Sequence, residues 1–142
     1  MSENSFVTEL QLIEGYKFNV KSDIDYIPDL IVDETKPVGE GVGLNPTRLL
    51  SASVGHCMSS SLIYCLKKAR IPIIDLNTTV KTSLFRNENG RLRIENIDLE
   101  IYLKVRDEDK PRVHRCLSIF EDYCTVTQSI RKGIKVQVKI KQ

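Results

Sequence analysis

The sequence has no tryptophan, only two histidines and no excess of charge of one sign. Its 21 lysines and arginines are nearly balanced by 19 acidic residues, which gives a formal net charge of +2. Nucleic-acid and acidic-membrane binding usually need a concentrated basic face, so this balance argues against either as the main function. The five cations between Arg131 and Lys141 are scattered along one segment and are typical of a solvated strand face.

The chain also lacks the segments that direct a protein to or across a membrane. Residues 1–5 carry neither the basic region nor the apolar core of a signal peptide. The longest uncharged stretch, residues 49–66, is interrupted by serines, a glycine and a histidine, and is too polar for hydrocarbon. We therefore expect a buried helix in a soluble, cytoplasmic protein, whose cysteines stay reduced unless they are catalytic or redox-sensing.

Several common catalytic and cofactor motifs are missing. The glycines of residues 39–43 have the spacing of neither a dinucleotide-binding loop nor a phosphate-binding loop, and no Gly-x-Ser-x-Gly elbow is present. Histidines and cysteines that could together hold a metal do not have metal-ligand spacing: His56, Cys57, His114, Cys116 and Cys124. We expect no metal and no cofactor, and place His114 on the surface of a charged helix.

The first half of the chain predicts strands followed by one long helix. Alternating residues over 6–12 and 16–20, separated by Glu14-Gly15, predict a hairpin, and residues 29–33 could supply a third strand. A loop rich in glycine and proline follows over residues 36–46. Asn45-Pro46 indicates a helix start, because Asn can cap and Pro suits the first turn. The helix is predicted over residues 46–69, before Ile71-Pro72.

The second half predicts a long hairpin. Residues 78–84 alternate, Asn89-Gly90 is typical of a type I′ turn, and the alternation resumes at Leu92. It changes phase before residues 97–105, which predicts a β-bulge near Glu95-Asn96.

A helix pair and a last strand complete the predicted fold. A helix opens at Asp107, and helical spacing predicts a buried stripe of Val113, Leu117, Phe120 and Cys124. Thr125 to Gln128 has the form of a capping box and starts a short helix that Gly133 ends. Residues 134–140 alternate and predict a final strand. The class is α+β, with a single domain over residues 1–142.

A chain of this length can bury enough surface to fold without disulfides, so its four cysteines are available for chemistry. Cys57 shares a helix face with Ser53, Ser60 and Ser61, which indicates close packing against another backbone or a polar pocket. Cys124 precedes a helix N-terminus, where the helix dipole lowers a thiol pKa. The two thiols could meet in space as a reactive pair, or both could be small buried residues.

The other two cysteines are interpreted as packing residues. Cys65 lies eight residues after Cys57 on the predicted helix, roughly 12 Å along its axis, so these two cannot form a disulfide with each other. Cys116 falls inside the predicted second helix.

Two segments resemble the OsmC/Ohr family. Residues 45–57, Asn-Pro-Thr-Arg-Leu-Leu-Ser-Ala-Ser-Val-Gly-His-Cys, are similar to the family segment that leads to its first cysteine. Residues 121–126, Glu-Asp-Tyr-Cys-Thr-Val, are similar to its second, a Cys-x-Val turn. The resemblance extends to element order over nearly the whole chain.

The resemblance implies an OsmC-like fold and an intertwined homodimer, with sheets wrapped around two central helices and active sites at the subunit interface. It further implies a peroxidase that reduces organic hydroperoxides, with Cys57 as the peroxidatic thiol and Cys124 as the resolving thiol. An external dithiol would then reduce the Cys57–Cys124 disulfide, and no cofactor would be required. Ser53, Thr47 and Lys17 are the candidate substrate-binding residues.

The chain departs from the active family members at two positions. Thr47 stands where they resemble one another in having a glutamate, and no arginine precedes Arg48, although they place one on the N-terminal strands. Lys17, Lys21 or Lys36 could substitute, although lysine lacks the planar fork of arginine. The sequence therefore resembles the divergent OsmC-like branch.

Two other functions stay open. One is a non-catalytic relative that binds a small apolar or thiol-bearing ligand at the dimer interface. The other is a hot-dog-type thioesterase, which would want a carboxylate near the central helix, where residues 46–66 have none.

Overall fold

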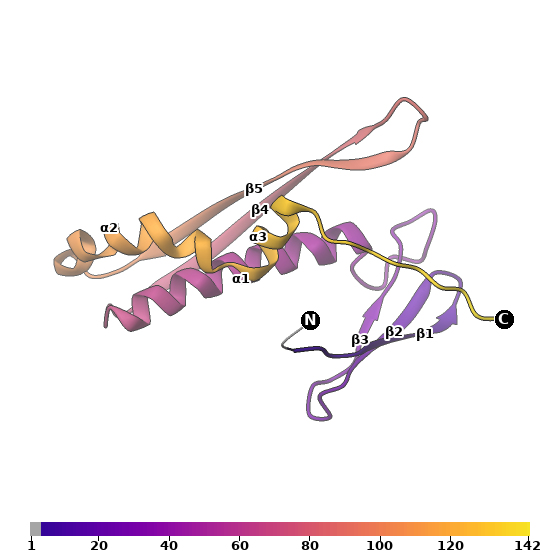
Figure 1. The fold of residues 1–142 in the computed structure, drawn as a ribbon, viewed down its shortest axis with the longest axis horizontal. Helices are drawn as coiled ribbons and strands as arrows, with labels where there is room; N and C mark the ends of the chain where they lie inside the picture. Colours follow the sequence, from indigo (N-terminus) through magenta and orange to yellow (C-terminus); the bar gives the residue numbers. More distant parts are fainter. Residues whose placement is uncertain (1–3) are drawn as a thin grey trace. The chain divides into compact units, whose positions relative to one another are not determined.

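The computed structural model describes residues 4–142, which form two compact units divided after residue 50 (Figure 1). The N-terminal unit is a small sheet with a long loop. The C-terminal unit contains a hairpin and the helices. The single domain over residues 1–142 remains a prediction.

The N-terminal unit contains an antiparallel three-stranded sheet. Its strands are β1 (Thr8–Glu14), β2 (Lys17–Ser22) and β3 (Leu30–Val32), in the order β1-β2-β3. The turn between β1 and β2 uses Gly15 with a positive φ of 51°, a conformation that glycine adopts without steric cost. The predicted hairpin and third strand are confirmed.

Asp33 organises the loop that follows this sheet. Its buried carboxylate accepts hydrogen bonds from the backbone N–H groups of Glu34 (2.8 Å), Glu40 (3.1 Å) and Val42 (3.3 Å). Burial alone would raise the pKa of Asp33, but these backbone donors outweigh it and the pKa is lowered. The predicted loop is therefore an ordered one, closed around a charged carboxylate.

The long helix α1 (Pro46–Lys68) has the predicted start and end to within one residue. The side chain of Asn45 caps it by accepting a hydrogen bond from the Arg48 N–H at 3.0 Å. At its other end, Arg70 adopts a positive φ of 56° and the Ile71 N–H donates to the Leu66 carbonyl at 2.9 Å. This closure satisfies a terminal carbonyl of the helix.

By length and composition α1 could also cross a membrane, because its most apolar window has a mean hydropathy of 1.3. The buried helix of a globular protein has the same composition. Leu62 and Leu66 are buried in the core of the C-terminal unit, and hydroxyl groups of α1 bond to a neighbouring strand. These contacts favour the predicted core helix.

A long antiparallel hairpin, β4 (Asp75–Arg86) and β5 (Leu92–Lys104), lies along α1 (Figure 1). The pairing shifts between Ser83 and Leu84, whose partners are Asn96 and Ile94, so Glu95 is the extra residue. The predicted bulge is confirmed.

The predicted type I′ turn is wrong. Such a turn needs a positive φ at both central residues. In the described chain Gly90 has a positive φ of 73° but Asn89 does not. The side chain of Asn87 instead accepts the N–H groups of Asn89 and Arg91, both at 3.0 Å, so the hairpin closes through a longer loop.

Small and hydroxyl residues bring α1 close to β4. Ser59 bonds to Thr78 at 2.6 Å, and Ser51 bonds to Thr82 at 2.5 Å. Between them, a Cβ added to Gly55 would lie only 2.7 Å from Val80 Cγ2, so a larger residue there would force the two elements to shift. Part of the serine content of α1 is thus explained by close packing.

Short helices complete the C-terminal unit: η1 (Asp107–Asp109), α2 (Lys110–Ile119), η2 (Phe120–Tyr123) and α3 (Thr125–Lys132). The buried stripe differs from the prediction, because Cys116 is 2% exposed whereas Leu117 is 49% exposed. Val113, Cys116 and Phe120 face the core, and the helix ends before Cys124.

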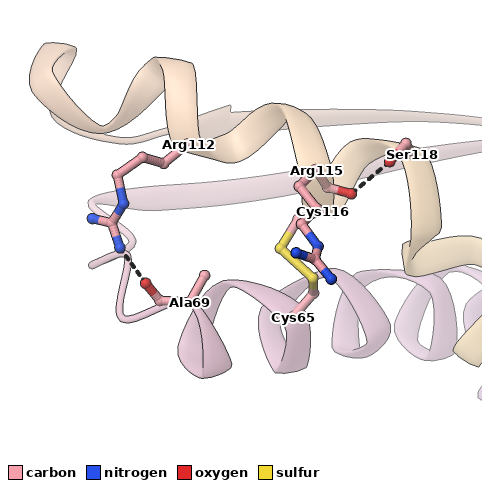
Figure 2. The surroundings of a disulfide bond; sticks show 6 residues. All are labelled: Cys65, Ala69, Arg112, Arg115, Cys116 and Ser118. Atoms are coloured by element: carbon pink, nitrogen blue, oxygen red, sulfur yellow. Dashed lines mark hydrogen bonds between the residues drawn. A yellow bond between two sulfur atoms is a disulfide. The ribbon is translucent and has the colours of Figure 1, made fainter.

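A disulfide joins α1 to α2, which corrects the interpretation of Cys65 and Cys116 as packing residues (Figure 2). Its half-cystines are 51 residues apart in sequence, with Cα atoms at 5.7 Å. Closing a loop of that length stabilises a fold by about 4 kcal/mol in the chain-entropy account. The guanidinium of Arg112 makes a second link, by donating to the Ala69 carbonyl at the end of α1.

The predicted final strand is not formed. Residues 134–142 have no regular secondary structure, and Ile134, Val136, Val138 and Ile140 are between 61% and 83% exposed. Alternation makes a segment suited to a strand, but a strand needs an edge with which to pair. No such edge receives this segment within the described chain.

Candidate functional site

Cys57 lies at the middle of α1 and is partly exposed, and its thiol contacts that of Cys124. Both cysteines are free in the structure. The sulfur of Cys57 also accepts the backbone N–H groups of Thr125 and Val126, the first two residues of α3. Two thiols that are 67 residues apart in sequence therefore meet at one helix end.

Cys124 is itself the N-cap of α3 and is fully buried. Its sulfur accepts the N–H of Thr127 at 3.5 Å and is hydrogen-bonded to Thr127 Oγ1 at 3.1 Å. The prediction that a short helix begins right after Cys124 is confirmed, and the sulfur of Cys124 caps it. The Gln128 side chain of the predicted capping box donates instead to the Glu121 carbonyl at 3.1 Å.

The two thiols have pKa values displaced in opposite directions. Burial would raise the pKa of Cys124, but the Thr127 hydroxyl and N–H, with Cys57 and Ser61, stabilise its thiolate and lower the pKa. Burial raises the pKa of Cys57, and the neighbouring Cys124 raises it further, against the N–H donors of Val126 and Thr125. The thiolate therefore forms more readily on Cys124 than on Cys57.

Ser61 supports this pair from within α1. It is buried, its hydroxyl donates to the Cys57 carbonyl at 3.0 Å, and it stabilises the thiolate of Cys124. Ser60, on the same predicted face, is exposed. Of these two serines, Ser61 is therefore the buried one that lies beside the thiols.

The candidate substrate-binding residues lie at separate places. Thr47 is half-buried in the first turn of α1, and Ser53 is exposed four residues before Cys57. Lys17, on β2, is paired with Glu14 at 3.0 Å and Glu40 at 2.7 Å. Hydrogen bonds to these two glutamates raise the pKa of Lys17, so it is a fixed cation whose charge is already compensated. The binding role of all three remains a prediction.

Both histidines, His56 and His114, are exposed, in agreement with the surface position predicted for His114. Within residues 4–142, no group of three or more histidine, cysteine or acidic side chains is arranged to hold a metal ion.

Sequence reasoning missed the donors that hold the thiols. They are main-chain groups of Thr125, Val126 and Thr127, which no residue-type pattern reveals. The usable signal was a cysteine immediately before a short predicted helix, since the first N–H groups of a helix have no partner within it.

One comparison with known proteins identifies a family. Residues 39–139 match the family described as OsmC-like protein. The comparison with curated protein sequences gave no match.

Similar solved structures cover almost the whole chain. An OsmC-like protein of unknown function from Vibrio cholerae has a TM-score of 0.75 at 9% identity, over 89% of this chain and 93% of that one. A hypothetical protein from Aquifex aeolicus has a TM-score of 0.69 at 24% identity, over 92% and 89%. A putative organic hydroperoxide resistance protein from Vibrio cholerae, with captopril in one of its active sites, has a TM-score of 0.67 at 18% identity, over 95% and 91%. At these identities the likeness shows the fold.

Proposed function

Since the chain belongs to the OsmC-like protein family, we propose that it is a thiol-dependent peroxidase that reduces organic hydroperoxides. The observation that carries the proposal is the contact between the thiols of Cys57 and Cys124 at the N-terminus of α3. A partly exposed thiol in contact with a buried one is the arrangement that a peroxidatic and a resolving cysteine need. Structural neighbours include proteins described as organic hydroperoxide resistance proteins, which supports the same chemistry.

The first step is attack on the peroxide by Cys57, the accessible thiol of the pair. The thiolate held by Cys124 takes the proton of Cys57, and the resulting Cys57 thiolate attacks the terminal peroxide oxygen. The O–O bond breaks, Cys57 becomes a sulfenic acid, and the alkoxide leaves and is protonated to the alcohol. The N–H groups of Val126 and Thr125 stabilise the Cys57 thiolate once it has formed.

The second step forms the disulfide between Cys57 and Cys124. The sulfur of Cys124 displaces hydroxide from the Cys57 sulfenic acid, which forms the disulfide, and the hydroxide leaves as water with the proton that Cys124 had taken. An external dithiol then reduces this disulfide and is itself oxidised. A supply of reducing dithiols is a property of the cytoplasm, where we place the protein.

Oxidation of the purified, reduced protein by one equivalent of cumene hydroperoxide tests the proposal. We expect one Cys57–Cys124 disulfide per chain, detected by mass spectrometry after alkylation and proteolysis. Hydrogen peroxide at the same concentration is the comparison, because it lacks the apolar group of cumene hydroperoxide. Two unmodified thiols after treatment would contradict the peroxidase.

A second candidate function is favoured by the raised pKa of Cys57 and by Thr47 at the position of the family glutamate. It is a non-catalytic protein that binds a small apolar or thiol-bearing ligand at the dimer interface. A high pKa keeps Cys57 as a neutral thiol, which suits binding better than nucleophilic attack.

Alkylation of Cys57 by iodoacetamide as a function of pH separates the two candidates. We expect Cys124→Ser to shift the labelling midpoint of Cys57 to lower pH, because the substitution removes the neighbouring charge that raises the pKa of Cys57. Serine is itself a good N-cap, so α3 keeps its start. An unchanged labelling midpoint in Cys124→Ser would contradict an electrostatic effect of Cys124 on Cys57. A wild-type midpoint above that of free cysteine, together with no disulfide formation on addition of peroxide, would favour the ligand-binding function.

We also propose that the protein works as a homodimer. In the N-terminal unit, only Val32 and Asp33 are buried among residues 4–50, so this sheet has almost no core of its own. In the C-terminal unit, the tip of the β4–β5 hairpin exposes Leu84, Phe85 and Leu92. Exposed apolar surface on this scale is typical of a protein–protein interface. A second copy would cover it, as the family resemblance implies.

A further inference from the structure

A pocket of about 380 Å³ lies beside the Cys65–Cys116 disulfide, within the C-terminal unit. Both half-cystines line it, so the disulfide is part of its wall. The ring of Tyr64 from α1 and that of Tyr123 from η2, 6.4 Å apart, form an aromatic side of the same pocket. The volume is within the range of small-molecule sites, roughly 300–1,000 Å³.

The pocket is positively charged. Its lining contains Lys68, Arg112 and Arg115 and, among the described residues, no carboxylate. Asp109 compensates part of the charge of Arg112, through an ion pair at 3.0 Å. The side chain of Arg115 extends from α2 towards α1, as the disulfide does (Figure 2). The ammonium group of Lys68 lies 5.2 Å from the centre of the Tyr64 ring.

The two cysteine residues of the disulfide differ in exposed fraction. Cys116 is 2% exposed, whereas Cys65 is half-buried. A thiolate approaching through the pocket therefore reaches Cys65 first. The cations around it attract an anionic reagent and stabilise the thiolate that leaves, which are the conditions that speed thiol–disulfide exchange.

We propose that Cys65–Cys116 is a second redox site, which exchanges with a small thiol that also carries a carboxylate or sulfonate group. The reagent's thiolate attacks Cys65, a bond forms between the two sulfurs, and the Cys65–Cys116 bond breaks with its electron pair on Cys116. A second thiolate then attacks the reagent's sulfur and releases the oxidised reagent, which leaves Cys65 as a thiolate. Two thiolates are oxidised to one disulfide, and the protein disulfide is reduced to two thiols.

This exchange goes beyond the proposed peroxidase and does not depend on it. Cys57 and Cys65 are eight residues apart on α1, roughly 12 Å along the helix, so the two redox pairs are separate. A protein with Cys57→Ser and Cys124→Ser keeps the second site alone. Its behaviour therefore tests the exchange even if the peroxidase proposal fails.

The test compares three small thiols of different charge on that double variant at low ionic strength: 2-mercaptoethanesulfonate (anionic), 2-mercaptoethanol (neutral) and cysteamine (cationic). Samples are quenched with iodoacetamide and Cys65 and Cys116 are quantified by mass spectrometry, with rates divided by the thiolate fraction of each reagent. We expect the anionic thiol to react about tenfold faster than the neutral one, and the cationic thiol to be slowest. In about 1 M salt the differences should collapse, since the screening length falls to about 3 Å.

Arg115→Gln should reduce the preference for the anionic thiol severalfold. Lys141→Gln is the matched control, because it removes one positive charge from an exposed position outside the pocket. Equal rates for the three thiols would overturn the proposal, as would an undiminished preference in Arg115→Gln. Free Cys65 and Cys116 thiols in protein purified in air, without reductant, would overturn it as well.

Discussion

Replacing Cys57 by serine is expected to abolish the reduction of cumene hydroperoxide, lowering the rate by about a thousandfold or more, as loss of an enzyme's nucleophile does. The hydroxyl of serine cannot take the place of a thiolate at neutral pH, and the buried Cys124 cannot reach a substrate that Cys57 meets. The measurement is a steady-state assay with excess dithiol, which follows the loss of peroxide.

Cys124→Ser should give a different defect. This variant is expected to consume one equivalent of peroxide and then stop, because Cys57 forms a sulfenic acid that no neighbouring thiol resolves. A sulfenic-acid trap such as dimedone should label Cys57 in the variant and not in the wild type. The contrast between one turnover and none assigns the two roles separately.

The control for both variants is Cys65→Ser combined with Cys116→Ser. These residues line a pocket that contains neither Cys57 nor Cys124, and we expect the double variant to keep its peroxidase activity at temperatures where it stays folded. Loss of activity there at full folding would mean that peroxide reduction uses the second pair. Unchanged activity in Cys57→Ser would contradict the peroxidase mechanism outright.

The hydrogen-bond donors around Cys57 and Cys124 offer a substitute for the family's usual charged residues in the proposed peroxidase. An arginine near the first cysteine would lower its pKa directly, but none precedes Arg48 in this sequence. Here main-chain N–H groups of α3 and the Thr127 hydroxyl act on the two sulfurs in the direction that lowers a thiol pKa. Under the proposed mechanism, Cys124 is the group that takes the proton of the accessible Cys57.

The sequence predicted the elements whose causes are local. Asn45 and Pro46 mark the start of α1 because capping and fixed φ act within one turn. The bulge at Glu95 follows from a change of phase that each strand carries in its own residues. The start of a short helix right after Cys124 is also local, and α3 begins there. The approach of Cys57 to Cys124 was left open by the residues themselves and was implied only by the family resemblance.

Features that depend on tertiary packing could not be predicted in this way. The Cys65–Cys116 disulfide requires α2 to lie on α1, and nothing in the neighbourhood of either cysteine indicates that. The same packing decides that Cys116 and not Leu117 faces the core.

Residues 134–140 do not form the predicted strand, because they have no partner strand within the described chain. Val136 and Val138 alternate with polar residues as strand residues do, yet they are 79% and 83% exposed. A segment with this pattern lacks only a partner edge, which a second chain would supply in a homodimer. The apolar side of the segment would then be buried between two protomers.

Val136→Glu combined with Val138→Glu is therefore expected to convert the dimer to monomers. Burying unpaired carboxylates costs several kcal/mol, and each 1.4 kcal/mol changes an equilibrium constant about tenfold, so the dissociation constant should rise by more than about a hundredfold. Gln137→Glu is the control, because it adds a carboxylate on the opposite side of the alternating segment and should leave the dimer intact. Sedimentation velocity over a range of concentrations measures both, with circular dichroism to establish that the helices remain folded. A wild-type monomer, or a double variant as dimeric as the wild type, would show that this segment is not part of an interface between two copies of the chain.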